Sequence, residues 1–106
     1  MTDFKSPPRV KDPAVFKWLH AEGVSCVLCG YPASLHHLVR RSQSGDDVKE
    51  NLIGLCALHH TALHAGDSDT RRRVGVCLTP DQIAYVQAKI GDGADDWLLR
   101  HYGVSA

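Results

Sequence analysis

The sequence predicts a small α+β domain, and three observations lead to this fold class. Two short apolar segments, around 34–39 and 52–56, are separated by a polar, glycine-containing stretch, which is typical of two strands joined by a loop. Segments with helix start and stop signals lie on both sides of this pair. The chain has 106 residues, which is the length of one domain with a modest core.

Two helices are expected next to the strand pair. The first covers residues 13–22, with Asp12 as a plausible N-cap and Gly23 where a helix C-cap belongs. The second follows the second strand directly, because residues 57–65 are rich in strong helix formers and Gly66 comes after them.

The C-terminal part predicts two further helices after a polar link that contains three arginines. Thr79 and Gln82 form a capping-box start, and the apolar face of this helix would hold Ile83, Val86 and Ile90. The last short helix offers three large side chains for packing, namely Trp97, Leu98 and Tyr102. We therefore expect a flexible N-terminal tail over 1–11 and one domain over 12–106, with its core at about 24–66 and C-terminal helices at about 79–103.

Composition and charge limit the classes of protein. The 12 basic and 12 acidic residues give zero net charge, which argues against a generally sticky nucleic-acid binder but leaves local DNA contacts open. No apolar run is long enough to cross a bilayer and the start lacks a secretion signal, so we expect a cytoplasmic protein with no membrane partner. In that reducing compartment, closely spaced cysteines and histidines hold metal more often than they form disulfides.

Four of these residues have the spacing of a structural zinc site. Cys26 and Cys29 form a C-x-x-C pair, and Cys56 and His59 form a C-x-x-H pair farther along the chain. Together they would make a closed Cys3His site that joins the turn before the strands to the following helix. The first pair alone could equally be a redox pair or two buried cysteines. Cys77 has no such neighbour, and we expect it to be a small buried core residue.

The remaining histidines of this region suggest a second site. At about 100° per residue, His60 and His64 share one helix face while His59 points elsewhere. The first strand supplies His36 and His37, which face opposite ways unless the chain bends, so one could join the helix pair while the other stands beside it to accept a proton. Histidines without a chemical role are the alternative, which the gathering of five of the seven histidines between 36 and 64 disfavours.

The ordered motifs resemble those of a known family. In sequence they are C-x2-C, HHLVRRS, the Asn51 of ENLIGLC, and C-x2-H-H-x3-H. Over residues 26–64 this set resembles the HNH endonucleases, specifically the small zinc-stapled HNH proteins of bacteria and phages, whose core is the ββα-metal fold. One departure is that the second half-site usually reads C-x2-C-H. His59 stands in place of that cysteine here, and imidazole is an accepted zinc ligand.

Similarity to this family implies a role for each matching residue. The catalytic divalent ion would be held by three imidazoles, those of His36, His60 and His64. His37 would be the general base, and Asn51 would tie down the hairpin loop and keep the base oriented. Arg41 would contact phosphate, with Arg40 as a weaker candidate.

These roles suit hydrolysis of a DNA phosphodiester. A neutral histidine accepts a proton near neutral pH, and a well-placed general base contributes about 100-fold to 10,000-fold. We expect structural Zn²⁺ together with catalytic Mg²⁺ or Mn²⁺, and three imidazoles also suit Zn²⁺ or Ni²⁺. The run Arg71 to Arg73 would either meet further phosphates or be a solvated link. DNA is the expected partner, with weak sequence preference, and a larger phage or host nuclease complex is a further candidate partner.

Two other functions remain open at the level of sequence. A noncatalytic zinc module that binds nucleic acid or protein would explain the Cys3His set, but it gives no reason for the second group of histidines. A metallohydrolase with a different substrate would also use His60 and His64. A protease is disfavoured, because Thr61 stands where an H-E-x-x-H motif has its glutamate.

Overall fold

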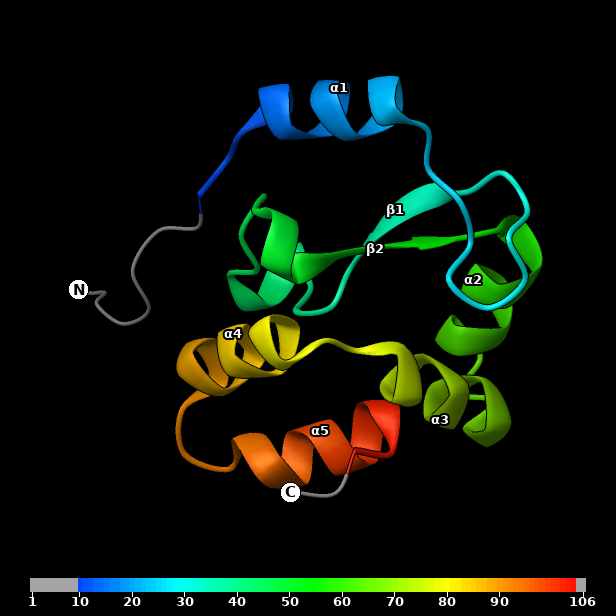
Figure 1. Cartoon of the computed structure of the whole chain (residues 1–106). Coiled ribbons are helices and arrows are strands. Elements are labelled where there is room, and N and C mark those ends of the chain that lie inside the picture. The colour runs from blue at the N-terminus through cyan, green and yellow to red at the C-terminus, as the bar shows by residue number, and fades with distance from the viewer. Residues whose placement is uncertain (1–9, 105–106) are drawn as a thin grey trace.

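The secondary structure confirms the predicted α+β class. The structure is a computed structural model that describes residues 10–104, so positions 1–9 of the expected tail lie outside the described residues (Figure 1). The described elements are, in order, α1 (Pro13–Glu22), β1 (Ser34–His37), β2 (Leu52–Leu55), α2 (Ala57–His64), α3 (Ser68–Cys77), α4 (Pro80–Ile90) and α5 (Ala94–Tyr102). Within this part of the chain, no helix combines the length and the apolar character needed to cross a bilayer.

The two strands form an antiparallel hairpin, with His36 opposite Ile53. Both strands are slightly shorter than predicted. The first ends at His37 because the next backbone groups bond to Asn51: Val39 N–H donates to its side-chain oxygen at 2.8 Å instead of to a strand partner. Two 3-10 turns then build the loop between the strands, η1 (Arg41–Gln43) and η2 (Lys49–Asn51).

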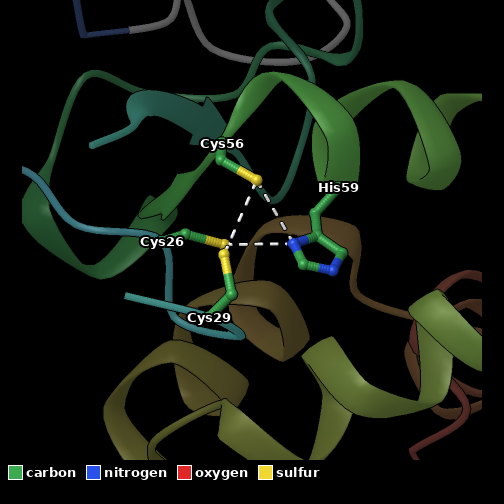
Figure 2. A group of neighbouring side chains, drawn as sticks. All are labelled: Cys26, Cys29, Cys56 and His59. Carbon is green, nitrogen blue, oxygen red and sulfur yellow. Dashed lines mark hydrogen bonds between the residues drawn. The ribbon is translucent and has the colours of Figure 1, made fainter. Parts of the chain in front are cut away.

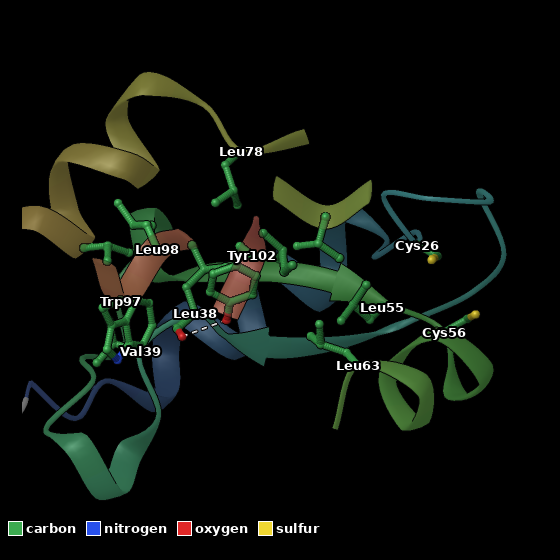
Figure 3. Packing of buried hydrophobic residues seen from close by; sticks show 13 residues of the cluster. Cys26, Leu38, Val39, Leu55, Cys56, Leu63, Leu78, Trp97, Leu98 and Tyr102 are labelled. Atoms are coloured by element: carbon green, nitrogen blue, oxygen red, sulfur yellow. Dashed lines mark hydrogen bonds between the residues drawn. The ribbon is translucent and has the colours of Figure 1, made fainter. Parts of the chain in front are cut away.

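The core lies between the hairpin and the C-terminal helices. In Figure 1, α1 runs along one side of the hairpin, and α4 and α5 lie on the other side. Figure 3 shows the side chains that fill this space, and the most deeply buried of them are Leu38, Leu55, Leu98, Val39, Val74 and Val86. Burial of apolar surface between these elements holds the helix that follows the hairpin in a fixed place.

The predicted helix ends are confirmed where capping signals are strong. The reciprocal capping box of α4 is present, with Gln82 N–H donating to Thr79 and Thr79 N–H donating to the Gln82 side chain. Helix α1 covers the predicted residues 13–22, and the positive φ of 88° at Gly23 fits its predicted place after the helix end. In α5, the three predicted packing residues are all buried: Trp97, Leu98 and Tyr102.

The segment with three arginines was predicted to be a polar link between helices, but it forms a helix of its own, α3. Asp67 caps this helix by accepting bonds from the Thr70 amide at 2.9 Å and the Thr70 hydroxyl at 2.6 Å. Thr70 and Val74, four residues apart, are buried on one face against the core. Arg72 and Arg73 are exposed, and the charged residues mask this weak apolar face in the sequence.

Cys77 was also predicted incorrectly, since it is exposed rather than buried. It is the last residue of α3 and lies outside both cysteine and histidine clusters. The buried positions near this helix end are taken by Val74 and Leu78 instead. Cys77 therefore provides a useful control position for the experiments below.

Candidate metal centres and catalytic cleft

The three cysteines and His59 converge where the turn after α1 meets the start of α2 (Figure 2). The Sγ atoms of Cys29 and Cys56 are 3.7 Å apart. The Nδ1 atom of His59 lies 3.5 Å from Cys26 Sγ and 3.3 Å from Cys56 Sγ. All four candidate ligand atoms lie within 4.8 Å of one another.

This spacing fits a tetrahedral metal ion. A tetrahedron with zinc bond lengths of about 2.3 Å to sulfur and 2.0 Å to nitrogen has S···S edges of about 3.8 Å and S···N edges of about 3.5 Å. The observed edges are close to these values, so the Cys3His cluster could hold a metal such as zinc. The four ligands also join segments that are far apart in the chain, which is how a structural metal adds stability to a small domain.

The backbone around Cys26 favours a thiolate. Burial alone would raise the pKa of this thiol, but hydrogen bonds from the backbone at Cys56, Leu28 and Cys29 lower the pKa to about 6. A thiolate is the form that binds metal. The backbone around Cys26 therefore supplies the donors that stabilise the negative charge of this ligand.

A second cluster joins β1 to α2 and is called the histidine triad, which consists of His36, His60 and His64. The Nε2 atom of His60 lies 3.3 Å from Nδ1 of His36 and 2.9 Å from Nε2 of His64. At these separations neutral rings can share an N–H···N hydrogen bond, or turn their lone pairs toward a shared cation. Three imidazole nitrogens would suit a divalent ion of the transition series, and the exposed His64 places this cluster next to solvent.

His36 and His60 are held in the neutral form that ligates metal. Burial, followed by the nearby His60 and His64, lowers the pKa of His36 to about 3. Burial also lowers the pKa of His60, with His64 adding to the shift. Neutral rings at pH 7 present lone pairs without first having to lose a proton.

Tyr102 of α5 fixes which nitrogen of His36 is protonated. Its hydroxyl donates to the carbonyl of Leu38 at 2.8 Å, and it lies 3.3 Å from Nε2 of His36. Because the hydroxyl proton is already used, this hydrogen bond must run from His36 Nε2–H to the Tyr102 oxygen. The lone pair of His36 is then on Nδ1, the atom that faces His60.

His37 is paired with a carboxylate beside the triad. Its Nε2 atom lies 2.9 Å from Oδ1 of Asp47, and the side chains are 11% and 7% exposed. Asp47 is itself held by the backbone amide of Asp12 at 3.0 Å. With the proton on Nε2 donated to Asp47, the lone pair of His37 is on Nδ1. A carboxylate that orients an imidazole in this way is the arrangement a general base requires.

One open cleft of about 430 Å³, called the metal cleft below, is lined by His37 and by the three histidines of the second cluster. Both adjacent histidines of β1 line it, although only His36 belongs to the triad. The other lining residues include His60, His64 and the two cations Arg40 and Arg41. The cleft therefore combines a candidate metal site, an oriented imidazole and positive charge, which is a set suited to a phosphate ester.

Asn51 holds the loop that carries these residues. It is completely buried, and its amide group makes three hydrogen bonds. The side-chain oxygen accepts from Val39 N–H at 2.8 Å, and Nδ2 donates to the carbonyls of Val39 at 3.1 Å and Asp46 at 3.0 Å. These bonds tie the end of β1 to the residue before Asp47, so Asn51 acts on His37 through the loop and does not reach the cleft itself.

The arginine run of α3 does not act as a single patch. Arg72 pairs with Asp69 at 3.2 Å, and Arg73 donates to the carbonyl of Leu28. Arg71 lies instead in a pocket next to the metal cleft. Sequence reasoning missed two residues of the site, Asp47 and Tyr102, and only the acidic pair in the hairpin loop could have suggested the first of them.

The comparisons with known proteins add no relative. A scan against family models, a search of curated proteins and a search of solved structures each found no match for this chain. Membership of the HNH family therefore stays a prediction from the ordered motifs. What the chain can do must be inferred from the geometry of its two clusters and the cleft.

Proposed function

We propose that the protein is a metal-dependent endonuclease that hydrolyses phosphodiester bonds in DNA. The observation that carries this proposal is that His37, which is paired with Asp47, lines the same cleft as the His36, His60 and His64 triad. A zinc module that only binds a partner needs the Cys3His cluster, but it has no use for an oriented imidazole next to a second candidate metal site.

His37 would perform the proton transfer in this reaction. Its Nδ1 atom takes a proton from a water molecule while the water oxygen attacks phosphorus and the bond to the 3′ oxygen breaks, and the departing 3′ oxygen takes a proton from solvent water. Asp47 keeps the ring in the required tautomer and stabilises the imidazolium that forms. The products carry a 5′ phosphate and a 3′ hydroxyl, as the resemblance to HNH endonucleases implies.

The rest of the cleft would bind and stabilise the phosphate. Arg40 and Arg41 line the cleft and would position the phosphodiester through charge-assisted hydrogen bonds. A divalent ion held by the triad would supply Lewis-acid stabilisation of the phosphoryl and leaving oxygens. We propose Mg²⁺ or Mn²⁺ for this role and Zn²⁺ for the Cys3His cluster, and a triad of imidazoles would also bind Zn²⁺ or Ni²⁺.

Plasmid nicking tests the proposal directly. Zinc-loaded protein should convert supercoiled plasmid to nicked or linear DNA with Mg²⁺ or Mn²⁺, and a chelator should stop the reaction. His37→Ala should lower the rate by about 100-fold to 10,000-fold, the usual contribution of a general base. Cys77→Ser, at an exposed position outside both clusters, is the matched control and should cleave like the wild type.

The outcomes separate the candidate functions. Full activity in His37→Ala would remove the assignment of the base. Folded, zinc-loaded protein that cleaves no DNA with any of these metals would contradict the nuclease and favour the noncatalytic zinc module. Mapping the ends on random duplexes would also test weak sequence preference, because one dominant site would contradict it.

A further inference from the structure

A small pocket separate from the metal cleft lies where α5, α3 and the segment after β1 meet. Its volume is about 30 Å³, room for a few water molecules or one compact anion. His36, His64 and Arg40 line both this pocket and the metal cleft, so Arg40 lies between the two sites. A group bound in the pocket would therefore lie next to a group bound at the triad.

The lining of this pocket is rich in donors and contains no carboxylate. Arg40 and Arg71 supply two guanidinium groups, and His101 adds an imidazole. The pocket wall also includes Trp97, whose buried indole N–H has no hydrogen-bond partner among the described residues. Two arginines without a neighbouring acid leave uncompensated positive charge at a concave surface, which favours an oxyanion.

Ion pairing elsewhere on these helices shows that this charge is distinctive. Arg72 on α3 is paired with Asp69, and Arg100 on α5 is paired with Asp96 at 2.9 Å. By contrast, no ion pair within residues 10–104 joins Arg40 or Arg71 to a carboxylate. The charges of Arg72 and Arg100 are thus neutralised on the outer faces of the helices, whereas Arg40 and Arg71 bring theirs to the pocket without a paired carboxylate among the described residues.

The pocket side chains are also held in place. Arg71 donates to the backbone carbonyl of Arg100 at 3.2 Å, which orients its guanidinium without cancelling its charge. The ring of His101 packs on Trp97 with centroids 4.4 Å apart. Side chains that are already ordered lose less entropy when a ligand binds, so the site is preorganised for a small anion.

We propose that this pocket binds a second phosphate of the DNA strand, adjacent to the phosphodiester in the metal cleft. This proposal rests on the nuclease function proposed above. Phosphate is the chemistry that two guanidinium groups recognise best, through bidentate hydrogen bonds. Gripping two phosphates of one strand would fix its direction across the cleft, which a single phosphate contact cannot do. Arg71 would act as a positioning residue and not in the chemical step.

The first experiment tests the pocket without relying on cleavage. Inorganic phosphate is titrated into zinc-loaded protein, and NMR follows the ring signals of His101 and the indole signal of Trp97. We expect saturable shifts in the wild type and in Arg72→Gln, the charge-matched control on the same helix. Loss of these shifts in Arg71→Gln would support the pocket. Absence of saturable shifts in the wild type would overturn it, whether or not the protein cleaves DNA.

The second experiment identifies the source of the phosphate. Binding of a short duplex is measured against salt concentration in the His37→Ala background, which prevents cleavage. Arg71→Gln should weaken binding roughly tenfold, as expected for a hydrogen bond to a charged group, and reduce the salt slope by about one. Arg72→Gln should leave affinity and slope almost unchanged. Normal duplex binding by Arg71→Gln, despite lost phosphate shifts, would overturn the DNA strand as the ligand and assign the pocket to free phosphate.

Discussion

The Tyr102 hydroxyl lies 3.3 Å from Nε2 of His36, although 66 residues separate the two in the chain. It also donates to the carbonyl of Leu38, so the last helix determines the tautomer of a candidate metal ligand in the first strand. Burial raises the pKa of Tyr102, which keeps the phenol protonated and able to donate. The C-terminal helices are therefore part of the site as well as part of the core.

Tyr102→Phe should weaken metal binding at the triad while leaving the ring packing in place. Loss of an outer partner of a metal-binding histidine typically costs about 10-fold to 100-fold in affinity, because the ligand tautomer and ring orientation are no longer fixed. Titration of zinc-loaded protein with Mn²⁺ or Co²⁺ measures this effect. Tyr85→Phe is the matched control, since its hydroxyl bonds to Asp46 and not to the triad. Equal triad affinity in Tyr102→Phe and wild type would contradict the tautomer argument.

Asp47→Asn should reduce cleavage without removing the metal. Asparagine keeps an oxygen that can accept from the amide of Asp12, but it loses the charge that stabilises a protonated His37. The amide NH2 would then face Nε2 of His37 and favour the wrong tautomer, so we expect a rate loss of up to about 10,000-fold, as for the same change in a Ser-His-Asp triad. Single-turnover nicking at saturating Mn²⁺ measures the rate, and a Mn²⁺ titration of the same variant checks that triad affinity is unchanged. A normal cleavage rate would show that Asp47 does not assist the base.

The division of the α2 histidines between two clusters could be predicted from sequence because it depends on local helix geometry. The turn angle of a helix is enough to separate His59 from His60 and His64, and the structure places them in different clusters as predicted. The capping box at Thr79 is equally local. Where the residues of a motif lie within a few positions of one another, their relative placement follows from local backbone geometry and can be predicted from sequence.

The parts of the site that could not be predicted from sequence depend on tertiary contacts. Nothing in the spacing of residues shows that Tyr102 reaches His36, because that contact needs α5 to pack across the hairpin. Helix α3 was missed because only Thr70 and Val74 face the core, while charged residues dominate its composition. The exposed position of Cys77 follows from the same helix and could not be known without it.

Cys29→Ser should destabilise the whole domain through loss of the Cys3His cluster. Serine is a poor zinc ligand, and the metal joins the turn before the hairpin to α2, so we expect the free energy of unfolding to fall on the order of 3 kcal/mol or more. Zinc content and thermal unfolding by circular dichroism measure the two effects. Cys77→Ser should retain zinc and melt like the wild type, and His37→Ala should also melt almost normally. Equal melting temperatures for Cys29→Ser and Cys77→Ser would exclude a zinc staple.

The buried position of His36 predicts that acid weakens the fold, and this contribution adds to those of His60 and His101, whose pKa values burial also lowers. The pKa of His36 is about 3 in the folded protein and near 6.5 in the unfolded chain. At a pH between these two values, the unfolded chain binds a proton that the folded protein does not bind. The free energy of unfolding should therefore fall as pH decreases below about 6.5, and His36 alone should account for about 2 kcal/mol of the fall between pH 7 and pH 5.

Guanidinium unfolding at pH 7, 6 and 5, with one equivalent of zinc and no other divalent metal, measures this loss. His36→Asn removes the titrating ring, and the difference between its pH slope and that of the wild type isolates the contribution of His36. We expect the variant to be less stable at pH 7 but flatter with pH, since its polar side chain cannot gain the proton. Parallel slopes for the two proteins would show that His36 titrates in the folded state as it does in the unfolded chain. That result would contradict the assignment of His36 as a buried, neutral metal ligand.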